Sequence, residues 1–289
     1  MIRKTLPIII ITISYVFVSC STLPGKKDDR SLVITNRAAE YQKNGISQYN
    51  SGRYLQALDL FELAYQLNAS IDNEEGIVLT LNSIGRTKLA ELKNEEALEY
   101  LNRGLVIAER IDNKNLILLT KGNIGDYYIK IDDLNSAFSL LETEMESLEM
   151  VNNEESANLA HLFSLILRKQ TKYTQALEYL NRSLKFNLKN KTYRPLAADY
   201  YMLASIYSLQ EKYSEALLYA EEALKYDKMI EYPQGIAADL EALAIISEKN
   251  GNLEESEIYK KRAQIVLKAI GKINQIEIEQ SDLDNIQSQ

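Results

Sequence analysis

Little in this sequence suits catalysis or metal binding. The 289 residues include one cysteine, one histidine and no tryptophan. One cysteine excludes an internal disulfide and any multi-cysteine metal site, and one histidine leaves little material for acid–base chemistry. The patterns GxxxxGK, GxGxxG, HExxH and GxSxG are all missing from the sequence. We therefore expect a protein that is not an enzyme, with no catalytic residues, no metal site and no cofactor.

Proline, glycine and positive charge are also scarce. Only four prolines and 11 glycines occur, and few helix breakers combined with abundant Leu, Ala, Glu and Lys predict an all-α fold. The chain carries 41 acidic and 33 basic residues, which gives a formal charge of −8. Binding to nucleic acid needs clustered Lys and Arg on one face, so we expect no nucleic-acid partner.

The first twenty residues have the pattern of an export signal. Arg3 and Lys4 precede an apolar run from Leu6 to Val18, which is short for a membrane span and typical of a secretory signal peptide. The run ends in FVSC, which resembles the lipobox of bacterial lipoproteins and implies that residues 1–19 are removed and that Cys20 carries the lipid. An ordinary signal with an unmodified cysteine and an uncleaved anchor are the alternatives, and both still imply export.

The lipobox resemblance also implies a location in the cell envelope. Ser21, rather than Asp, follows the cysteine, which by the sorting rule of that family implies the outer membrane, facing the periplasm or the surface, if the host has two membranes. Residues 20–31 are polar and contain a Pro-Gly pair. We interpret them as a flexible tether between the lipid and the folded body.

Small residues recur through the body of the chain at a fixed period. One series is spaced by 40, 40, 39, 40 and 40 residues, and a second series lies twelve positions before it. The first series is Ala57, Ala97, Ala137, Ala176, Ala216 and Ser256, and the second is Gly45, Gly85, Gly125, Ser164, Ala204 and Ala244. Such a period indicates a stacked repeat array. Apolar residues at helical spacing around both series predict two amphipathic helices per repeat that cross closely at the small residues.

The pattern resembles the tetratricopeptide repeat. Repeat one is most similar, with its small, tyrosine and phenylalanine positions filled by Gly45, Tyr54, Ala57, Phe61 and Ala64. The resemblance implies a right-handed α-solenoid of about six helix-turn-helix repeats, of the branch with longer linkers. We place the solenoid at 32–270, with repeats at about 38–77, 78–117, 118–156, 157–196, 197–236 and 237–270. Residues 271–289 form a polar tail, which we expect to fray unless it docks on the body.

The resemblance also implies that the first helix of each repeat lines a concave groove. Carrying the groove positions over by register gives the candidate partner-binding residues Gln42, Asn82, Arg86, Asp126, His161, Arg168 and Tyr201. Asn123 is an eighth candidate, because it matches the asparagine with which family members with long repeats hold a peptide backbone. Amide and arginine side chains suit the backbone and carboxylate groups of a peptide. His161 has two interpretations, a pH-sensitive contact or a simply hydrogen-bonded side chain.

Three functions fit these features. The first is a non-catalytic scaffold, anchored to the membrane by its N-terminal lipid, that binds a protein or peptide partner of unknown identity within a cell-envelope assembly. The alternative is a component that binds a small molecule or peptide and delivers it to a membrane transporter, which needs a closed apolar pocket rather than an open groove. A structural spacer without a ligand is the third.

Overall fold

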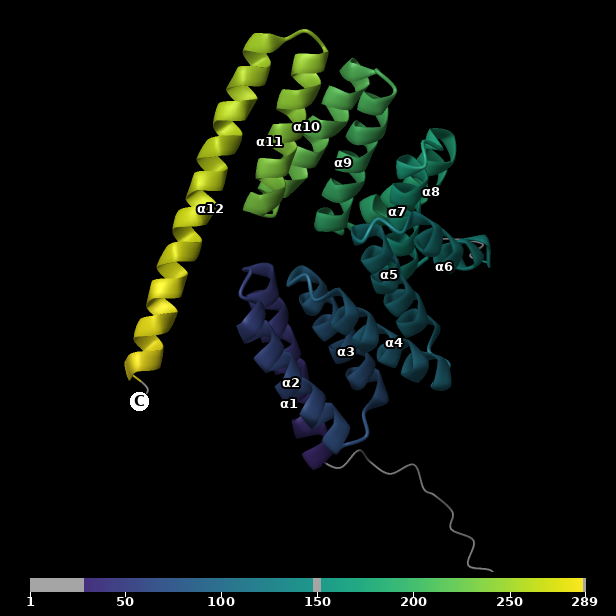
Figure 1. The fold of residues 1–289 in the computed structure, drawn as a ribbon, viewed down its shortest axis with the longest axis vertical. Helices are drawn as coiled ribbons and strands as arrows, with labels where there is room; N and C mark the ends of the chain where they lie inside the picture. Colours follow the sequence, from purple (N-terminus) through teal and green to yellow (C-terminus); the bar gives the residue numbers. More distant parts are fainter. Residues whose placement is uncertain (1–28, 148–151, 288–289) are drawn as a thin grey trace, which may run out of the picture.

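The computed structural model describes residues 29–147 and 152–287. These residues form twelve α-helices and no strand (Figure 1). The helices are α1 (Asp29–Asn50), α2 (Tyr54–Ser70), α3 (Glu74–Ala90), α4 (Asn94–Arg110), α5 (Lys114–Lys130), α6 (Leu134–Ser147), α7 (Glu154–Lys169), α8 (Tyr173–Asn190), α9 (Tyr193–Leu209), α10 (Tyr213–Met229), α11 (Pro233–Lys249) and α12 (Leu253–Gln287). The predicted all-α repeat solenoid is confirmed. The predicted signal peptide and Cys20 lie outside the described residues.

The helices come in six antiparallel pairs with the predicted period. The second helices of the pairs begin at residues 54, 94, 134, 173, 213 and 253, which are 40, 40, 39, 40 and 40 residues apart. The first pair starts earlier than expected, because α1 already begins at Asp29 inside the predicted tether. An acidic residue at this position stabilises a helix N-terminus.

The connections show where the forty-residue period comes from. Three residues join α2 to α3, and three also join α3 to α4. Both turns contain a residue with positive φ, Asp72 at 52° and Leu92 at 62°. The implied longer linker between repeats is therefore wrong for these turns. The extra length lies in the helices, most of which have 17 residues.

The predicted close crossing of the two helices in a repeat is confirmed at three glycines. A Cβ atom added to Gly85 would lie 2.7 Å from Cγ of Leu101 and 3.1 Å from the carbonyl oxygen of Ala97. The corresponding distances are 2.5 Å from Gly45 to Phe61 and 2.8 Å from Gly125 to Leu141. Only glycine lets these helices come so close, because any side chain would overlap the facing helix.

The repeats stack into a curved array whose inner layer is made by the odd-numbered helices. Each odd-numbered helix contacts the next one, from α1 with α3 to α9 with α11, whereas within the described chain no two even-numbered helices touch. Helices that are closer together lie on the inside of a curve, so the first helices of the repeats form the concave side. Figure 1 shows the resulting C-shaped arrangement, with α12 running back along its open side.

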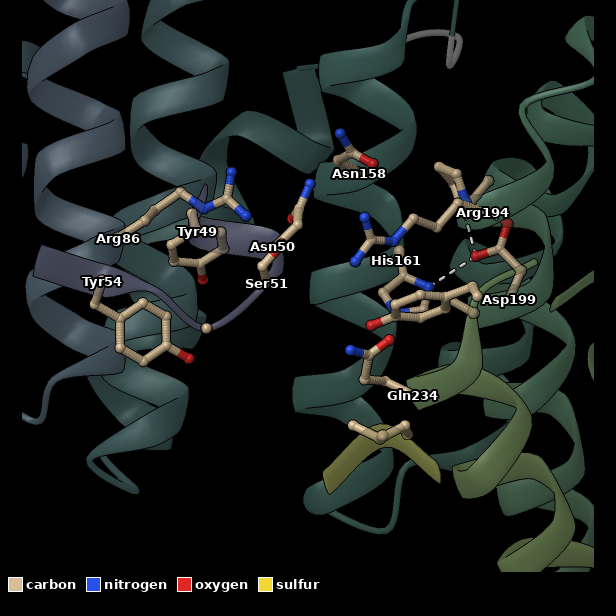
Figure 2. A pocket seen from close by; sticks show the side chains of 16 residues that line it. Tyr49, Asn50, Ser51, Tyr54, Arg86, Asn158, His161, Arg194, Asp199 and Gln234 are labelled. Carbon is tan, nitrogen blue, oxygen red and sulfur yellow. Dashed lines mark hydrogen bonds and ion pairs between the residues drawn. The ribbon is translucent and has the colours of Figure 1, made fainter. Parts of the chain in front are cut away.

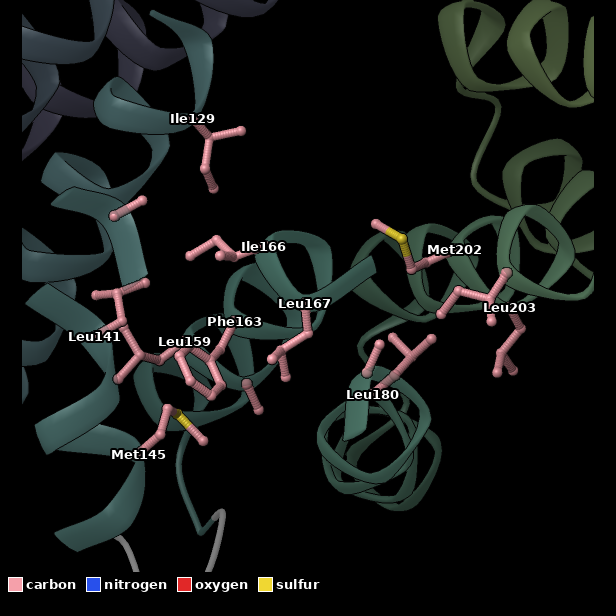
Figure 3. Packing of buried hydrophobic residues seen from close by; sticks show 14 of the residues in the cluster. Ile129, Leu141, Met145, Leu159, Phe163, Ile166, Leu167, Leu180, Met202 and Leu203 are labelled. Atoms are coloured by element: carbon pink, nitrogen blue, oxygen red, sulfur yellow. The ribbon is translucent and has the colours of Figure 1, made fainter. Parts of the chain in front are cut away.

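Apolar clusters between successive helices hold the inner layer in place. Figure 3 shows one of them, in which Leu141, Phe163, Ile166 and Leu180 are buried between the third, fourth and fifth repeats. Burying such side chains stabilises the stack by roughly 1.5–3 kcal/mol each. The cluster fixes α7 and α9, which carry much of the concave surface described below.

The C-terminal segment differs from the prediction. We expected the chain to fray after Gly271, but α12 continues to Gln287 and is 35 residues long. The residues from Gly271 onward contain no proline, so nothing in this segment interrupts helical hydrogen bonding.

Candidate functional site

A central hollow lies on the concave side of the array. It has a volume of about 670 Å³ and is bounded by the α1–α2 turn and α3 on one side and by α7, α9, α11 and α12 on the other. Side chains that line it include Tyr49, Tyr54, Arg86, Asn158, His161, Arg194, Asp199 and Gln234 (Figure 2). The hollow exists because the array curves far enough for the first two repeats to face the last three.

A smaller side hollow of about 290 Å³ adjoins it between α3, α5 and α7. It brings together four of the eight predicted residues, which are Arg86, Asn123, Asp126 and His161. Arg86 and His161 also line the central hollow. Whether these four residues bind a partner stays a prediction, but the structure places them on one continuous concave surface.

A buried carboxylate anchors the wall of the central hollow. Asp199 has no exposed surface and accepts hydrogen bonds from Nδ1 of His161 at 2.7 Å, from Oγ of Ser183 at 3.0 Å and from Nδ2 of Asn187 at 2.7 Å. The interpretation of His161 as a hydrogen-bonded side chain is therefore the one that the geometry supports. Sequence reasoning missed Asp199, although a signal was available. Asp199 lies five residues before the small residue Ala204, and the same position is threonine in α3 and α5.

Two of the predicted asparagines hold the repeats together. Asn82 is only 3% exposed, and its Nδ2 donates to the carbonyl oxygen of Val78 at 2.9 Å and to Oγ1 of Thr120 at 2.8 Å. Its Oδ1 accepts from Nδ2 of Asn123 at 2.6 Å. The prediction that Asn82 faces the groove is therefore wrong, because the side chain is turned into the contact between α3 and α5. Asn123 also lines the side hollow.

The other three predicted residues lie away from the central hollow. Gln42 lines a separate cavity of about 460 Å³ between α1 and α3, where its Nε2 donates to Oγ of Ser83 at 2.6 Å. Arg168 donates to Oγ of Ser205 at 2.9 Å, and burial lowers the pKa of its guanidinium. Tyr201 lines a shallow cavity of about 180 Å³ on α9 and α11. The candidate residues are thus spread along the concave side rather than gathered in one pocket.

A pair of buried aspartates lies between repeats five and six. Asp227 and Asp239 are 6% and 2% exposed, and they belong to α10 and α11. Burial, followed by the neighbouring Asp227 carboxylate, raises the pKa of Asp239 to about 8. Gly235 makes room for this pair, because a Cβ atom there would lie 1.8 Å from Oδ2 of Asp227.

Comparison with known proteins identifies the repeat. A family model described as tetratricopeptide repeat matches residues 155–229, which include α7 to α10 and thus two successive helix pairs. Residues 155–229 are tetratricopeptide repeats. The pairs outside the matched range keep the same period and the same close crossing, so the family assignment made from the sequence is confirmed.

Solved structures share the tetratricopeptide architecture at low identity. The Rap conjugation gene regulator of plasmid pLS20, in complex with the Phr* peptide, matches with a TM-score of 0.66 and 16% identity over 88% of this chain and 66% of that chain. The apo form of RapI matches with a TM-score of 0.63 and 17% identity, covering 82% of this chain and 85% of that chain. BtubC from P. vanneervenii matches at 0.59 and 14% identity, covering 78% and 92%. At these identities the matches show a shared fold.

One curated relative matches part of the array. Response regulator aspartate phosphatase E of Bacillus subtilis is 30% identical over 98 residues, which are 33% of this chain and 26% of that protein. The match therefore spans about a quarter of the phosphatase, and the activity in its name belongs to that protein. In the described parts of the tetratricopeptide chain, no three His, Cys, Asp or Glu side chains are placed to share a metal ion. None of the described helices has the length and apolar character needed to span a bilayer.

Proposed function

We propose that this protein is a non-catalytic scaffold that holds an extended segment of a protein or peptide partner in its central hollow. The observation that supports the proposal best is the set of exposed polar side chains that enter the hollow from separate repeats. Arg86, Asn158 and Gln234 come from repeats two, four and six, and all three are exposed. The two amides make no hydrogen bond within the described chain, so they are available to main-chain groups of a bound peptide.

The fold neighbours agree with this proposal. The Rap regulator of pLS20 has a similar arrangement of helices and was solved with a bound peptide. A further Rap protein, complexed with competence and sporulation factor, covers 82% of this chain with a TM-score of 0.59 and 18% identity. A curved array that exposes amides along its inner side suits the same kind of ligand.

We further propose that the scaffold acts in the cell envelope, held to a membrane by a lipid on Cys20. The support is the sequence: a positively charged start, a short apolar run and FVSC in front of a polar segment. Lipidation would determine where the protein is located, and the concave surface would determine which partner it binds.

Crosslinking capture from native membranes, followed by mass spectrometry, tests the proposal. The variant Arg86→Ala, Asn158→Ala, Gln234→Ala removes three groups from the hollow, and we expect it to lose a partner that wild type captures. The matched control is Arg103→Ala, Gln175→Ala, Asn181→Ala, which removes the same residue types from exposed positions on α4 and α8. Equal capture by all three proteins would contradict binding in the hollow. Loss of the captured partner in both variants would indicate that the partner also contacts the even-numbered helices.

A further inference from the structure

The central hollow contains unpaired positive charge in a protein whose net charge is negative. Arg86 on α3 and Arg194 on α9 enter it from opposite sides (Figure 2). Neither guanidinium has an ion-pair partner within the described residues, whereas Arg110 and Arg182 pair with Glu74 and Glu178. Arg103 and Arg262 also have no ion-pair partner among the described residues, so it is the presence of two such arginines in one hollow that favours a negative ligand there.

Aromatic rings orient both arginines. The guanidinium of Arg86 lies over the ring of Tyr49 at 5.4 Å, and that of Arg194 lies over the ring of Tyr232 at 4.3 Å. A guanidinium stacked on a ring keeps its N–H edges free and holds them in a fixed direction. Each edge can therefore donate two parallel hydrogen bonds to one carboxylate.

The acids near the hollow do not neutralise these arginines. Asp199 is the only carboxylate among the lining residues, and it is fully buried and used by His161, Ser183 and Asn187. Asp227, whose pKa is raised by burial and lowered by the field of Arg194, is buried between α10 and α11. Asp126 and Glu155 line the side hollow, which Arg86 also reaches, and Asp126 forms an ion pair with Lys130 at 3.0 Å. The central hollow thus has two arginines and one carboxylate, which is buried.

The helix ends around the hollow add to its positive character. The first turns of α9 and α11 line it, and neither helix has a side-chain cap. The first helices of repeats two, three and four, in contrast, are capped by Asn73, Asn113 and Asn153. Pro195 and Pro233 in the first turns of α9 and α11 have no N–H, and the remaining uncapped N–H groups carry partial positive charge that favours an anion.

We propose that the central hollow selects acidic partners, with a carboxylate of the bound peptide held between Arg86 and Arg194. The inference rests on the proposed function and adds to it the chemistry of the ligand. Because Arg86 belongs to repeat two and Arg194 to repeat five, one carboxylate bound by both connects the two ends of the curve. The carboxylate is an Asp or Glu side chain or the C-terminus of the peptide.

Affinity selection from a synthetic random decapeptide library with free C-termini tests the inference. The library is passed over the immobilised full chain, and retained peptides are sequenced by mass spectrometry. We expect wild type to retain peptides enriched in Asp and Glu or dependent on their C-terminus. The variant Arg86→Gln, Arg194→Gln removes both positive charges but keeps a polar side chain with N–H donors at each position, and it should lose this preference. Arg103→Gln, Arg182→Gln is the matched control on α4 and α8 and should retain it.

Resynthesised peptides then identify the carboxylate. Glu is replaced by Gln in one set of peptides, and the C-terminus is amidated in another. The change that removes the bound carboxylate should raise Kd about tenfold or more, and the change that removes the unbound carboxylate should leave Kd unchanged. Retained peptides without any acidic or C-terminal preference, or an equal preference in the Arg86→Gln, Arg194→Gln variant, would overturn the inference and leave the scaffold proposal standing. Retention of no peptide by wild type would overturn both.

Discussion

A single buried aspartate should make the stability of this protein depend on pH. The pKa of Asp239 is about 8 in the folded chain and 3.8 in its ordinary state. Between about pH 4 and pH 8 the folded protein therefore keeps a proton that the unfolded chain has lost, and the free energy of unfolding falls as the pH rises through this range. The charged groups around Asp239 are Asp227, which is hydrogen-bonded to it, and Arg194, which acts on Asp227.

The variant Asp239→Asn tests this linkage. Asparagine has the same shape, carries no charge and can donate a hydrogen bond to Asp227. We expect the variant to be more stable than wild type by about 1–3 kcal/mol at pH 8 and to approach wild type near pH 4. Thermal unfolding at several pH values measures the effect. A wild-type Tm that rises between pH 5 and pH 8 more steeply than that of the variant would contradict it.

At the scale of helices, one turn construction recurs along the described parts of the array, apart from the α6–α7 connection. Helices of mostly 17 residues alternate with short turns, and a residue with positive φ occurs in the turns on both sides of the helix pair. Gly52 and Gly251 are the glycines with positive φ in these turns, and the other turns place non-glycine residues such as Asp72 and Leu92 in this conformation. The hydrogen bond from Lys93 N–H to the carbonyl of Lys88, 2.9 Å long, closes one such helix end.

Close contact between the two helices of a repeat predicts a strong effect of one methyl group. Gly85→Ala places a Cβ atom 2.7 Å from Leu101, and we expect it to destabilise the protein by about 1–3 kcal/mol through overpacking. Gly271→Ala is the control, because nothing lies within 4 Å of a Cβ atom there and alanine favours the helix. Urea unfolding of the two variants compares them. An unchanged midpoint for Gly85→Ala would contradict a crossing that only glycine permits.

For the whole molecule, the main consequence of stacking is the curve that makes the central hollow. Tyr49 and Arg194 lie far apart in the sequence, and both line this cavity. The proposed membrane anchor belongs to the same scale, since it would place the hollow near a membrane surface. Its attachment site, Cys20, precedes the described helices by a short polar segment.

Replacing the proposed lipid site predicts a change of location. Cys20→Ala should move the protein from the membrane fraction to the soluble fraction, because the lipid is the only proposed attachment. Fractionation with a C-terminal tag and metabolic labelling with a fatty acid measure both properties. If the variant stays in the membrane fraction without a label, an uncleaved apolar segment holds the protein there.

The sequence by itself determined the repeats, because they depend on interactions between residues that are near in the chain. A helix crossing needs small residues such as Gly85 and Ala97 at a fixed spacing, and this requirement is visible in the letters as a period. The helices, their pairing and the inner layer were therefore predictable. The long α12 was not, because a polar segment has no apolar pattern that distinguishes a solvated helix from a frayed end.

Only the tertiary structure decided which polar side chains face the hollow. Asn82 and Arg86 are one helical turn apart on α3, yet Asn82 is turned into the contact with α5 and Arg86 into the cavity. The two residues lie on the same face, so their different positions along α3 make this difference: Asn82 lies beside Thr120 of α5, and Arg86, one turn further on, reaches the cavity. The meeting of Arg86 with Arg194 depends in addition on curvature added up over several repeats, which no pattern within one repeat encodes.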